Sequence, residues 1–540
     1  MAATFVALTA AALAVGVPAL TTAVAATAPT TTTSAPPTTS ATDPAAWPVY
    51  HHDVAGSGVA APVSGVTTTA PAWRSPVLDG QLYGEPLVVG GRVFVATEDD
   101  TVEALSATTG TVLWSDHVGT PVPSGSLPCG DITPTVGVTG TPVVDPARDE
   151  VFVVADEDVH GSPAHVLVGL DTTTGRTVAT RDVDPSGSDP AALLQRTGLT
   201  LDAGQVVFGF GGNYGDCSTY RGWVVVAVPE SGGTPADFAV DSAPGESQGA
   251  VWMGGAAPTV DASGDVWAAA GNGSVTSDAH AYDDSDSVLQ LSPAMRLLQF
   301  FAPTSWASDN RDDLDLSMAP ALLANGQVVE AGKARTAYLL DGAHLGGIGG
   351  QRAAVATGCD DDVDGGAAVV GSTVYLPCLS GVVAVTADAS PAALHVVWAS
   401  HVGGGPPIVA GGLVWTIGQD GTLDGLDPAT GAVRQQASVG APANHFPTPA
   451  VGDGVLLAPA ADRVVAFAAP STSTPAPTTV APSTTAPSTT LPPGVGVPAR
   501  RGPGLPLAAK ILIFTAIGLV VAAAAWTLGS RRGRGDPPPG

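Results

Sequence analysis

The residues best suited to chemistry are a lysine, an asparagine and a group of carboxylates in the middle of the chain. Lys333 is the only lysine before residue 507, and Asn272 lies between two glycines. A buried ammonium group is costly unless it is paired. We therefore expect Lys333 to lie near the central channel and to meet a carboxylate of the segment 309–315, with Asn272 facing the same cavity. The carboxylates of that segment are Asp309, Asp312, Asp313 and Asp315.

Each of these residues also has an ordinary structural interpretation. Asn272, beside glycine, suits a left-handed turn position, and the carboxylates of 309–315 suit a solvated loop. Two other acidic runs, Asp283-Asp284 and Asp360-Asp361-Asp362, could hold calcium, which takes oxygen ligands. The pair His51-His52 is expected to be structural. The sequence has no His-Glu-x-x-His or phosphate-loop motif, so it does not indicate the enzymes that those motifs mark.

A repeated sequence pattern predicts the strands and turns that must position these residues. In Leu105–Trp114 a strand leads into a turn closed by Gly110, and a second strand ends on tryptophan. The pattern recurs at Leu170–Gly175 and Leu426–Gly431. Glycine suits a turn with positive φ, and tryptophan supplies a large area for a neighbouring sheet to bury. The recurrence predicts an array of blades.

The first repeat predicts a blade of four antiparallel strands, which is the size of a propeller blade. Its strands are expected at Glu85–Val89, Arg92–Glu98, Thr101–Ser106 and Thr111–Val118. Further repeats start near Thr141, Gly198, Ala256, Ala319, Gly366, Pro406 and Thr448. This gives an all-β propeller of eight blades, with seven as the alternative.

The last repeat supplies only three strands, whereas Thr69–Val77, which contains Trp73, has no local partner. We expect the strand of Trp73 to pair with the strand around Val464–Phe467. This pairing would close the ring and leave no long unpaired edge.

The two ends of the chain predict export and a membrane anchor. Phe5–Leu20 is apolar and is followed by Ala23-Val24-Ala25, which predicts a signal peptide over 1–25. An uncleaved anchor is the alternative, because no basic residue precedes the apolar run. Residues 507–528 are long enough to span a bilayer, and the arginines at 531, 532 and 534 predict a cytoplasmic tail over 529–540. Thr/Pro/Ser-rich linkers are expected at 26–46 and 471–506, around a domain at 47–470 that lies outside the cell.

The net charge of the chain bears on the kind of partner that it can bind. The formal charge of −29 repels phosphate backbones, so nucleic acid is excluded as a partner.

The four cysteines allow three disulfide pairings outside the cell. Cys359 and Cys378 flank one short segment and can meet within a blade, which leaves Cys129 to pair with Cys217. A metal site is the alternative, although no two cysteines are closely spaced and no histidine pattern accompanies them.

The Leu-x-Ala-x-Thr-Gly-x-x-x-Trp pattern of 105–114 resembles the tryptophan-docking repeat of quinoprotein β-propellers, which bind pyrroloquinoline quinone (PQQ). The segment Trp47–Asp53, with Gly56 and Gly58, is similar to the lead-in of their first blade. The resemblance covers roughly residues 47–469 and implies the fold. It carries less information on function, because the same propeller serves dehydrogenases and non-enzymatic scaffolds.

The resemblance also implies roles for the residues named first. Ala270–Gly273 resembles the turn whose asparagine ligates Ca²⁺, which would make Asn272 a metal ligand. The segment 306–315 resembles the one that supplies another Ca²⁺ ligand, for which Asp309 and Asp313 are the candidates. Trp306–Asp315 is similar to the segment that holds the catalytic base, for which Asp312, Asp313 and Asp315 are the candidates. Ala331-Gly332-Lys333 resembles the strand whose basic residue touches the quinone, and Asn272 would lie beside it.

Several family features are absent from the sequence. There is no adjacent Cys-Cys pair, no Cys-x-x-Cys-His haem motif and no clear counterpart of the glutamate ligand, since an insertion follows Glu157. We therefore expect a monomeric, membrane-tethered, non-catalytic binding or scaffolding propeller without a cofactor. Its ligand would be an envelope protein, a small molecule or a glycan. The alternative is a PQQ- and Ca²⁺-dependent alcohol or sugar dehydrogenase.

Overall fold

The computed structural model describes residues 45–60, 66–229 and 234–468. The predicted signal peptide, C-terminal linker, membrane helix and basic tail lie outside these residues, as does nearly all of the first linker. No helix in the described part of the chain is long and apolar enough to cross a membrane.

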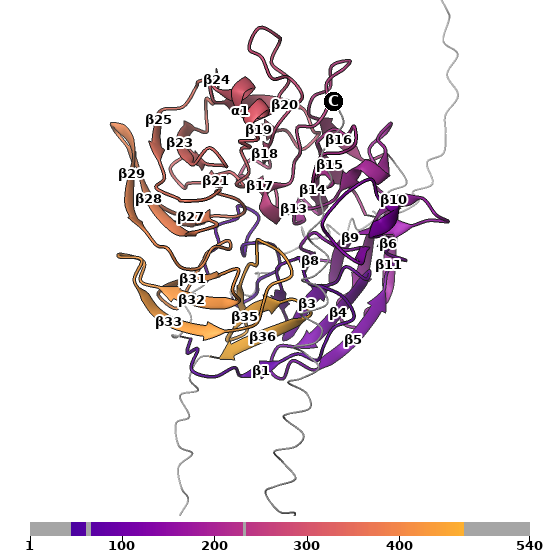
Figure 1. Ribbon diagram of the computed structural model, residues 1–540. Helices are drawn as coiled ribbons and strands as arrows, with labels where there is room; N and C mark the ends of the chain where they lie inside the picture. Colours follow the sequence, from indigo (N-terminus) through magenta and orange to yellow (C-terminus); the bar gives the residue numbers. More distant parts are fainter. Residues whose placement is uncertain (1–44, 61–65, 230–233, 469–540) are drawn as a thin grey trace, which may run out of the picture. The chain divides into compact units, whose positions relative to one another are not determined.

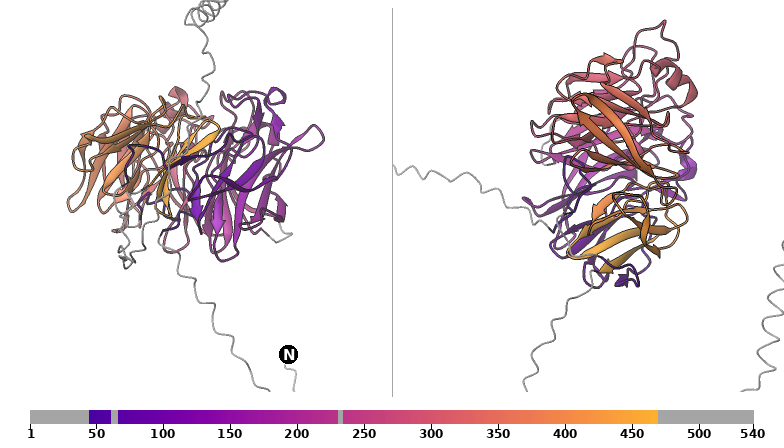
Figure 2. Two further views of the ribbon diagram at one scale, coloured as in Figure 1. Left: turned by 90° about the horizontal axis from the view of Figure 1, so that it is seen from below. Right: turned by 90° about the vertical axis from the view of Figure 1, so that its left-hand side faces the viewer.

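Eight sheets, each built from antiparallel blade strands, form the blades of a propeller, as the repeats predict (Figures 1 and 2). The first four blades follow one another along the chain. They comprise β2 (Leu87–Val89), β3 (Arg92–Ala96), β4 (Thr101–Ser106) and β5 (Val112–His117); β8 (Val143–Asp145), β9 (Glu150–Asp158), β10 (Pro163–Asp171) and β11 (Thr177–Asp182); β13 (Thr200–Asp202), β14 (Gln205–Gly212), β15 (Trp223–Ala227) and β16 (Ala236–Ala239); and β17 (Thr259–Val260), β18 (Val266–Ala270), β19 (Ser287–Leu291) and β20 (Leu297–Ala302).

The second half of the ring continues in the same order. It comprises β21 (Ala321–Leu322), β22 (Gln327–Glu330), β23 (Thr336–Asp341) and β25 (Ala353–Ala356); β26 (Ala368–Val370), β27 (Thr373–Cys378), β28 (Gly381–Ala389) and β29 (Ala392–Ala399); β30 (Ile408–Ala410), β31 (Leu413–Ile417), β32 (Thr422–Leu426) and β33 (Val433–Ser438); and β34 (Ala450–Gly452), β35 (Val455–Ala460) and β36 (Arg463–Ala468), completed by β1 (Trp73–Arg74). The first strands of several neighbouring blades contact one another, among them β34 with β2, β2 with β8 and β13 with β17, and they lie on the inner side of the ring.

The ring closes as predicted. The strand β1 pairs with β36, with Trp73 opposite Ala466 and Arg74 opposite Val465. The last blade therefore combines three strands from the C-terminal end of the domain with one from its N-terminal end. Neither edge of the ring is left open.

Contacts between blades explain why the repeat pairs a glycine with a tryptophan. The indole of Trp73 lies on Gly110 of the next blade, where an added Cβ would come within 2.3 Å of the ring. The Trp73 Nε1 donates to the Ala107 carbonyl at 2.9 Å. Trp114 covers Gly175 in the same way. Glycine is required at these turns both because φ is positive and because the neighbouring indole occupies the place of a side chain.

Both expected disulfides are present. Cys129 and Cys217 join two long loops, with Cα atoms 6.2 Å apart. Cys359 and Cys378 are joined within one blade, with Cα atoms 5.8 Å apart. Both separations lie in the ordinary range for disulfides.

One expectation about the acidic segment is wrong. Residues 306–312 do not form a solvated loop but the helix α1 (Trp306–Asp312). The helix is held because Trp306 is buried and packs edge-on against Tyr282, with ring centroids 5.0 Å apart. This packing leaves Asp309 and Asp315 buried, whereas Asp312 and Asp313 are exposed.

Candidate functional site

The structure brings Lys333, Asn272, Asp313 and Asp315 together. Asn272 lies two residues after β18 and Lys333 lies three residues after β22. These strands are the second strands of adjacent blades, so their ends meet on the same face of the ring. The helix α1 ends just before Asp313, which adopts a left-handed conformation with φ of 58° and turns the chain back toward Lys333.

Lys333 forms two ion pairs. Its Nζ lies 2.7 Å from Asp315 Oδ2 and 3.0 Å from Asp313 Oδ1. The lysine and Asp315 side chains are largely buried, whereas that of Asp313 is 72% exposed. Burial disfavours the charged ammonium, but the two carboxylates outweigh this effect and hold the pKa of Lys333 above its usual value. Lys333 is therefore a fixed positive charge at neutral pH.

Asn272 bonds to the same two carboxylates. Its backbone N–H donates to Asp315 Oδ1 at 2.6 Å, and its side-chain Nδ2 donates to Asp313 Oδ1 at 2.5 Å. Asn272 is not in the left-handed region, so the turn-residue interpretation is wrong. Its Oδ1 is buried and has no hydrogen-bond partner.

Three more carboxylates act on this cluster electrostatically. Asp216 interacts with Asp313, Asp315 and Lys333, and Asp362 and Asp364 interact with Lys333. Burial raises the pKa of Asp364 to about 7, although Ser317 donates a hydrogen bond to it. A single ammonium thus faces an excess of acidic groups.

An aromatic contact that the sequence did not predict lies beside Lys333. The ammonium sits over the indole of Trp252, 5.5 Å from the ring centroid, within range of a cation–π interaction. Trp252 also contacts Phe446, and their ring centroids lie 5.7 Å apart. Trp252 precedes blade 4 and Phe446 precedes blade 8, so the two rings join opposite sides of the propeller.

The lead-in segment, residues 47–53, contacts the residues just before β26. The Gly366 N–H donates to the Tyr50 hydroxyl at 3.1 Å, and His51 Nδ1 lies 3.2 Å from the Ala367 carbonyl. His51 is fully buried, and this burial lowers its pKa to about 4. A cavity of about 10 Å³ remains beside these rings, which is room for about one water molecule. The structural interpretation of His51 is therefore supported.

These contacts test whether PQQ and Ca²⁺ fit. Both oxygens of Asp315 and the Oδ1 of Asp313 are already bonded to Lys333 or Asn272. No group of three His, Cys, Asp or Glu side chains in the described residues is placed to hold a metal ion. Contacting carbon layers lie about 3.5 Å apart, so a flat ring between two groups needs about 7 Å. Trp252 is closer than that to both Lys333 and Phe446, and in this geometry a stacked quinone does not fit between them.

The other candidate residues lie apart from this cluster. Asp309 Oδ2 accepts from Ser305 Oγ at 2.6 Å, and Asp312 pairs with Arg311 at the surface. Neither bonds to Lys333 or Asn272 among the described residues. Asp283 bonds to Ser285.

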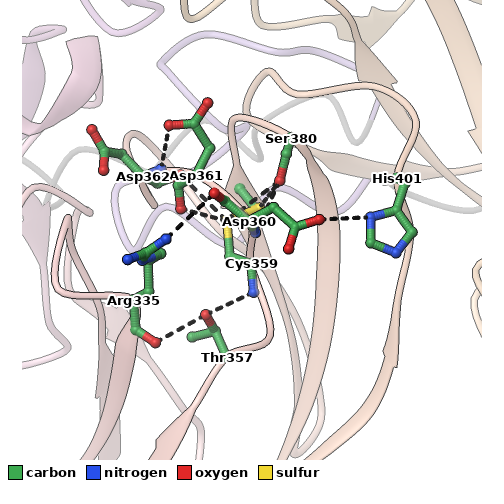
Figure 3. The surroundings of a disulfide bond; sticks show 9 residues. Arg335, Thr357, Cys359, Asp360, Asp361, Asp362, Ser380 and His401 are labelled. Atoms are coloured by element: carbon green, nitrogen blue, oxygen red, sulfur yellow. Dashed lines mark hydrogen bonds and ion pairs between the residues drawn. A yellow bond between two sulfur atoms is a disulfide. The ribbon is translucent and has the colours of Figure 1, made fainter.

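The acidic run 360–362 surrounds the Cys359–Cys378 disulfide instead of converging on one point (Figure 3). Asp360 pairs with His401 at 3.3 Å, and its carbonyl accepts from Arg335 at 3.4 Å. Asp361 accepts from the Asp362 backbone N–H at 3.0 Å. As Figure 3 shows, these side chains point in different directions, which does not suit a shared cation.

Comparisons with known proteins agree with the fold. The profile of the family described as outer membrane protein assembly factor BamB matches residues 63–144. The quinohemoprotein alcohol dehydrogenase of Comamonas testosteroni superposes with a TM-score of 0.58 at 17% identity, covering 79% of this chain and 80% of that one. A europium-containing methanol dehydrogenase gives 0.56 at 14% identity, covering 79% and 98%. The fold is that of the PQQ-type β-propellers.

A further PQQ-type propeller of known structure, the quinohemoprotein alcohol dehydrogenase ADHIIG of Pseudomonas putida HK5, gives a TM-score of 0.58 at 14% identity, covering 79% of this chain and 80% of that one. No curated protein matches the sequence. At these identities the likeness concerns the fold alone. The function of this PQQ-type propeller must be argued from its own residues.

Proposed function

We propose that this PQQ-type propeller is a non-catalytic binding module. The observation that carries the proposal is the double ion pair of Lys333 with Asp313 and Asp315, beside the contact of Trp252 with Phe446. Lys333, Asp313 and Asp315 are bonded to one another or to Asn272 and are therefore not free for a cofactor. The cluster then serves to hold blades 4 and 5 and the segment after α1 in place.

The setting we propose is the outer face of a membrane. The apolar stretch 507–528 and the arginines after it support a single C-terminal anchor with the propeller outside the cell. Two disulfides suit that oxidising environment. The partner would be an envelope protein, a small molecule or a glycan, bound by a monomeric propeller.

A spectroscopic titration tests the proposal. PQQ and Ca²⁺ are added to the purified full-length chain, the absorption spectrum is recorded, and dye-linked oxidation of alcohols and sugars is assayed. We expect neither a bound-quinone spectrum nor turnover. Saturable quinone binding with turnover that Lys333→Met abolishes would overturn the proposal.

A PQQ- and Ca²⁺-dependent dehydrogenase is the second candidate, and one observation favours it. The Oδ1 of Asn272 is buried without a partner, and an amide oxygen is a suitable Ca²⁺ ligand. Calorimetric titration of the wild type with Ca²⁺ distinguishes the two candidates. Tight binding that is lost in Asn272→Ala would support the dehydrogenase, whereas the binding module predicts no difference between the two proteins.

A further inference from the structure

Two buried carboxyl groups lie where blade 1 meets blade 2. Asp100 is in the turn between β3 and β4, and Asp156 is in β9. Asp100 is fully buried and Asp156 is 3% exposed. Within the described part of the chain, none of their four carboxyl oxygens has a hydrogen-bond partner. Burying a carboxylate without such partners is costly, so each group favours its neutral, protonated form.

The backbone around Asp100 leaves space for its side chain and for little else. Asp100 has φ of 53°, and the equivalent turn of blade 7 has Gly421 with φ of 74° at this place. Two other glycines close over the carboxyl group. An added Cβ at Gly119 would come within 3.0 Å of Asp100 Oδ2, and one at Gly137 would come within 2.8 Å of its Oδ1. The carboxyl group therefore cannot turn away from this place unless the backbone of these glycines moves with it.

Both glycines belong to the connection between blades 1 and 2, residues 118–142. Backbone hydrogen bonds attach this connection to the two acidic residues. The Val118 N–H donates to the Asp100 carbonyl at 2.8 Å, and the Asp156 N–H donates to the Gly137 carbonyl at 3.1 Å. The connection is thus held at the same residues that carry the two carboxyl groups, so a change in the charge of either group acts on it directly.

Most of the charged groups around the pair are acidic. The residues that act on Asp100 electrostatically are, in order of strength, Asp156, Glu157, Glu98 and Asp99. The groups that face Asp156, its neighbour His165 or Glu98 from the remaining elements are Asp182, Asp184 and Arg196. His165 Nε2 lies 3.8 Å from Asp156 Oδ2, while its Nδ1 already bonds to Asp184 at 2.7 Å. In the described residues no ion pair neutralises Asp100, so a proton is what keeps this group neutral.

We propose that Asp100 and Asp156 form a proton-dependent latch that holds the 118–142 connection against blades 1 and 2. While Asp100 keeps its proton, the pair never carries two negative charges and the connection stays closed. When that proton leaves, like charges repel each other in a buried place, and the connection opens so that water can reach both groups. The latch is a conformational device of the fold and does not rest on the proposed binding function.

The pH range of the latch follows from the burial of the two groups. Burial, and after it the charge of Asp156, raises the pKa of Asp100 to about 9, and burial raises that of Asp156 to about 7. In the open form both groups are hydrated and have pKa values near about 4. A raised pKa in the closed form stabilises that form at low pH, and this stabilisation is lost as pH rises to the raised value. Between pH 7 and 9 the loss therefore comes from Asp100, at up to about tenfold in the closed-to-open ratio per pH unit.

Hydrogen–deuterium exchange of the full-length chain, read by mass spectrometry of its peptides, tests the latch between about pH 7 and 9. Each exchange rate is divided by the intrinsic rate at the same pH. Protection in residues 118–142 should fall at least about tenfold over this range, because opening releases one proton. Peptides of β28 in blade 6 should keep their protection, which distinguishes local opening from global unfolding.

Three variants assign the effect to the carboxyl pair. Asp100→Asn keeps the shape of the side chain but has no proton to lose, so protection of 118–142 should fall less than about threefold. Asp156→Asn removes the neighbouring charge and should make the fall between pH 7 and 9 smaller than in the wild type. Asp424→Asn is the matched control, because Asp424 is 1% exposed and accepts from Gln436 Nε2 at 2.9 Å in blade 7; here 118–142 should behave as in the wild type. If Asp100→Asn fails to fold, Asp156→Asn decides.

Several results would overturn the inference. These are constant protection of 118–142 in the wild type from pH 7 to 9, an equal fall in the folded Asp100→Asn variant, or an equal fall in β28. Protection that Ca²⁺ restores at pH 9, and choline chloride of the same ionic strength does not, would also overturn it, because a metal ion would then neutralise the pair. None of these results concerns the Lys333 cluster, so the proposed binding function stands or falls by its own titration.

Discussion

Replacing Lys333 by methionine tests the ion-pair cluster most directly. The lysine side chain is 16% exposed and that of Asp315 is 8% exposed, with 2.7 Å between their charged atoms. Breaking a buried pair costs about 3–5 kcal/mol. Asp313 is largely exposed and can rehydrate, and Asp315 keeps the hydrogen bond from the Asn272 backbone. We therefore expect the low end of that range, about 3 kcal/mol.

This energy converts into a modest shift of the melting temperature. Unfolding entropy near 60 °C is about 2.1 cal/mol/K per residue, so a propeller of roughly 420 residues has about 0.9 kcal/mol/K. A loss of about 3 kcal/mol then lowers Tm by about 3 °C. Calorimetry of the full-length chain at pH 7 measures the shift.

Two further variants separate the buried pair from a general charge effect. Arg352→Met breaks an exposed pair of comparable length, 2.6 Å, and should cost under about 1 kcal/mol. In the double variant Lys333→Met/Asp315→Asn the unpaired charge is gone, so part of the stability should return. Equal shifts in Lys333→Met and Arg352→Met, or fully additive single effects, would refute this reasoning.

Three other measurements follow from the structure. The Cys129–Cys217 disulfide spans 88 residues and the Cys359–Cys378 disulfide spans 19. Cys129→Ala should therefore lower Tm more than Cys359→Ala does, with a difference equivalent to about 1.4 kcal/mol on the chain-entropy estimate. Equal Tm values for the two variants would contradict this. Trp73→Ala should cost about 3–5 kcal/mol by leaving a cavity over Gly110, and a loss below about 1 kcal/mol in denaturant titration would show that the β1 strand does not close the ring in solution. Burial raises the pKa of Asp100 to about 9, so the folded state holds the proton of this carboxyl more tightly than the unfolded state does, and the resulting stabilisation is lost as pH rises from about 4 to 9. Over that range Tm should fall less steeply in Asp100→Asn than in the wild type. Identical slopes would contradict this prediction.

The sequence predicts the features that repeat. The strand, turn and glycine of 105–110 recur because each blade must dock on the next, so a propeller of eight blades, with seven as the alternative, and the pairing of Trp73 with the strand of Ala466 could be inferred from the spacing of the repeats. The cysteine pairs followed from loop lengths. Lys333 was recognisable because it is the sole lysine of the domain, and its need for a carboxylate is a matter of charge.

The residues that line the channel were not predicted, because they belong to no motif. Trp252, Arg196 and Phe446 are far apart in the chain and meet only when the ring is complete. One signal was present: Arg196 and Phe446 occupy the same place before the first strand of their blades. Sequence also could not decide whether 306–312 forms a loop or a helix, since this depends on the packing of Trp306 against Tyr282.

The closure of the last blade has a consequence for the order of folding. The strand β1 waits for a partner almost 400 residues further along the chain, from Trp73 to Ala466. Until the last blade has been synthesised, Trp73 lacks the sheet that later holds it, and Gly110 remains uncovered. Contacts of such long sequence separation form slowly, because the chain loses the entropy of closing a long loop before it gains the energy of the contact. The earlier blades can form as they emerge, but the propeller becomes a closed body only with its final strand. Until then its two ends are sheet edges open to other chains, so the period most vulnerable to aggregation is the one just before completion.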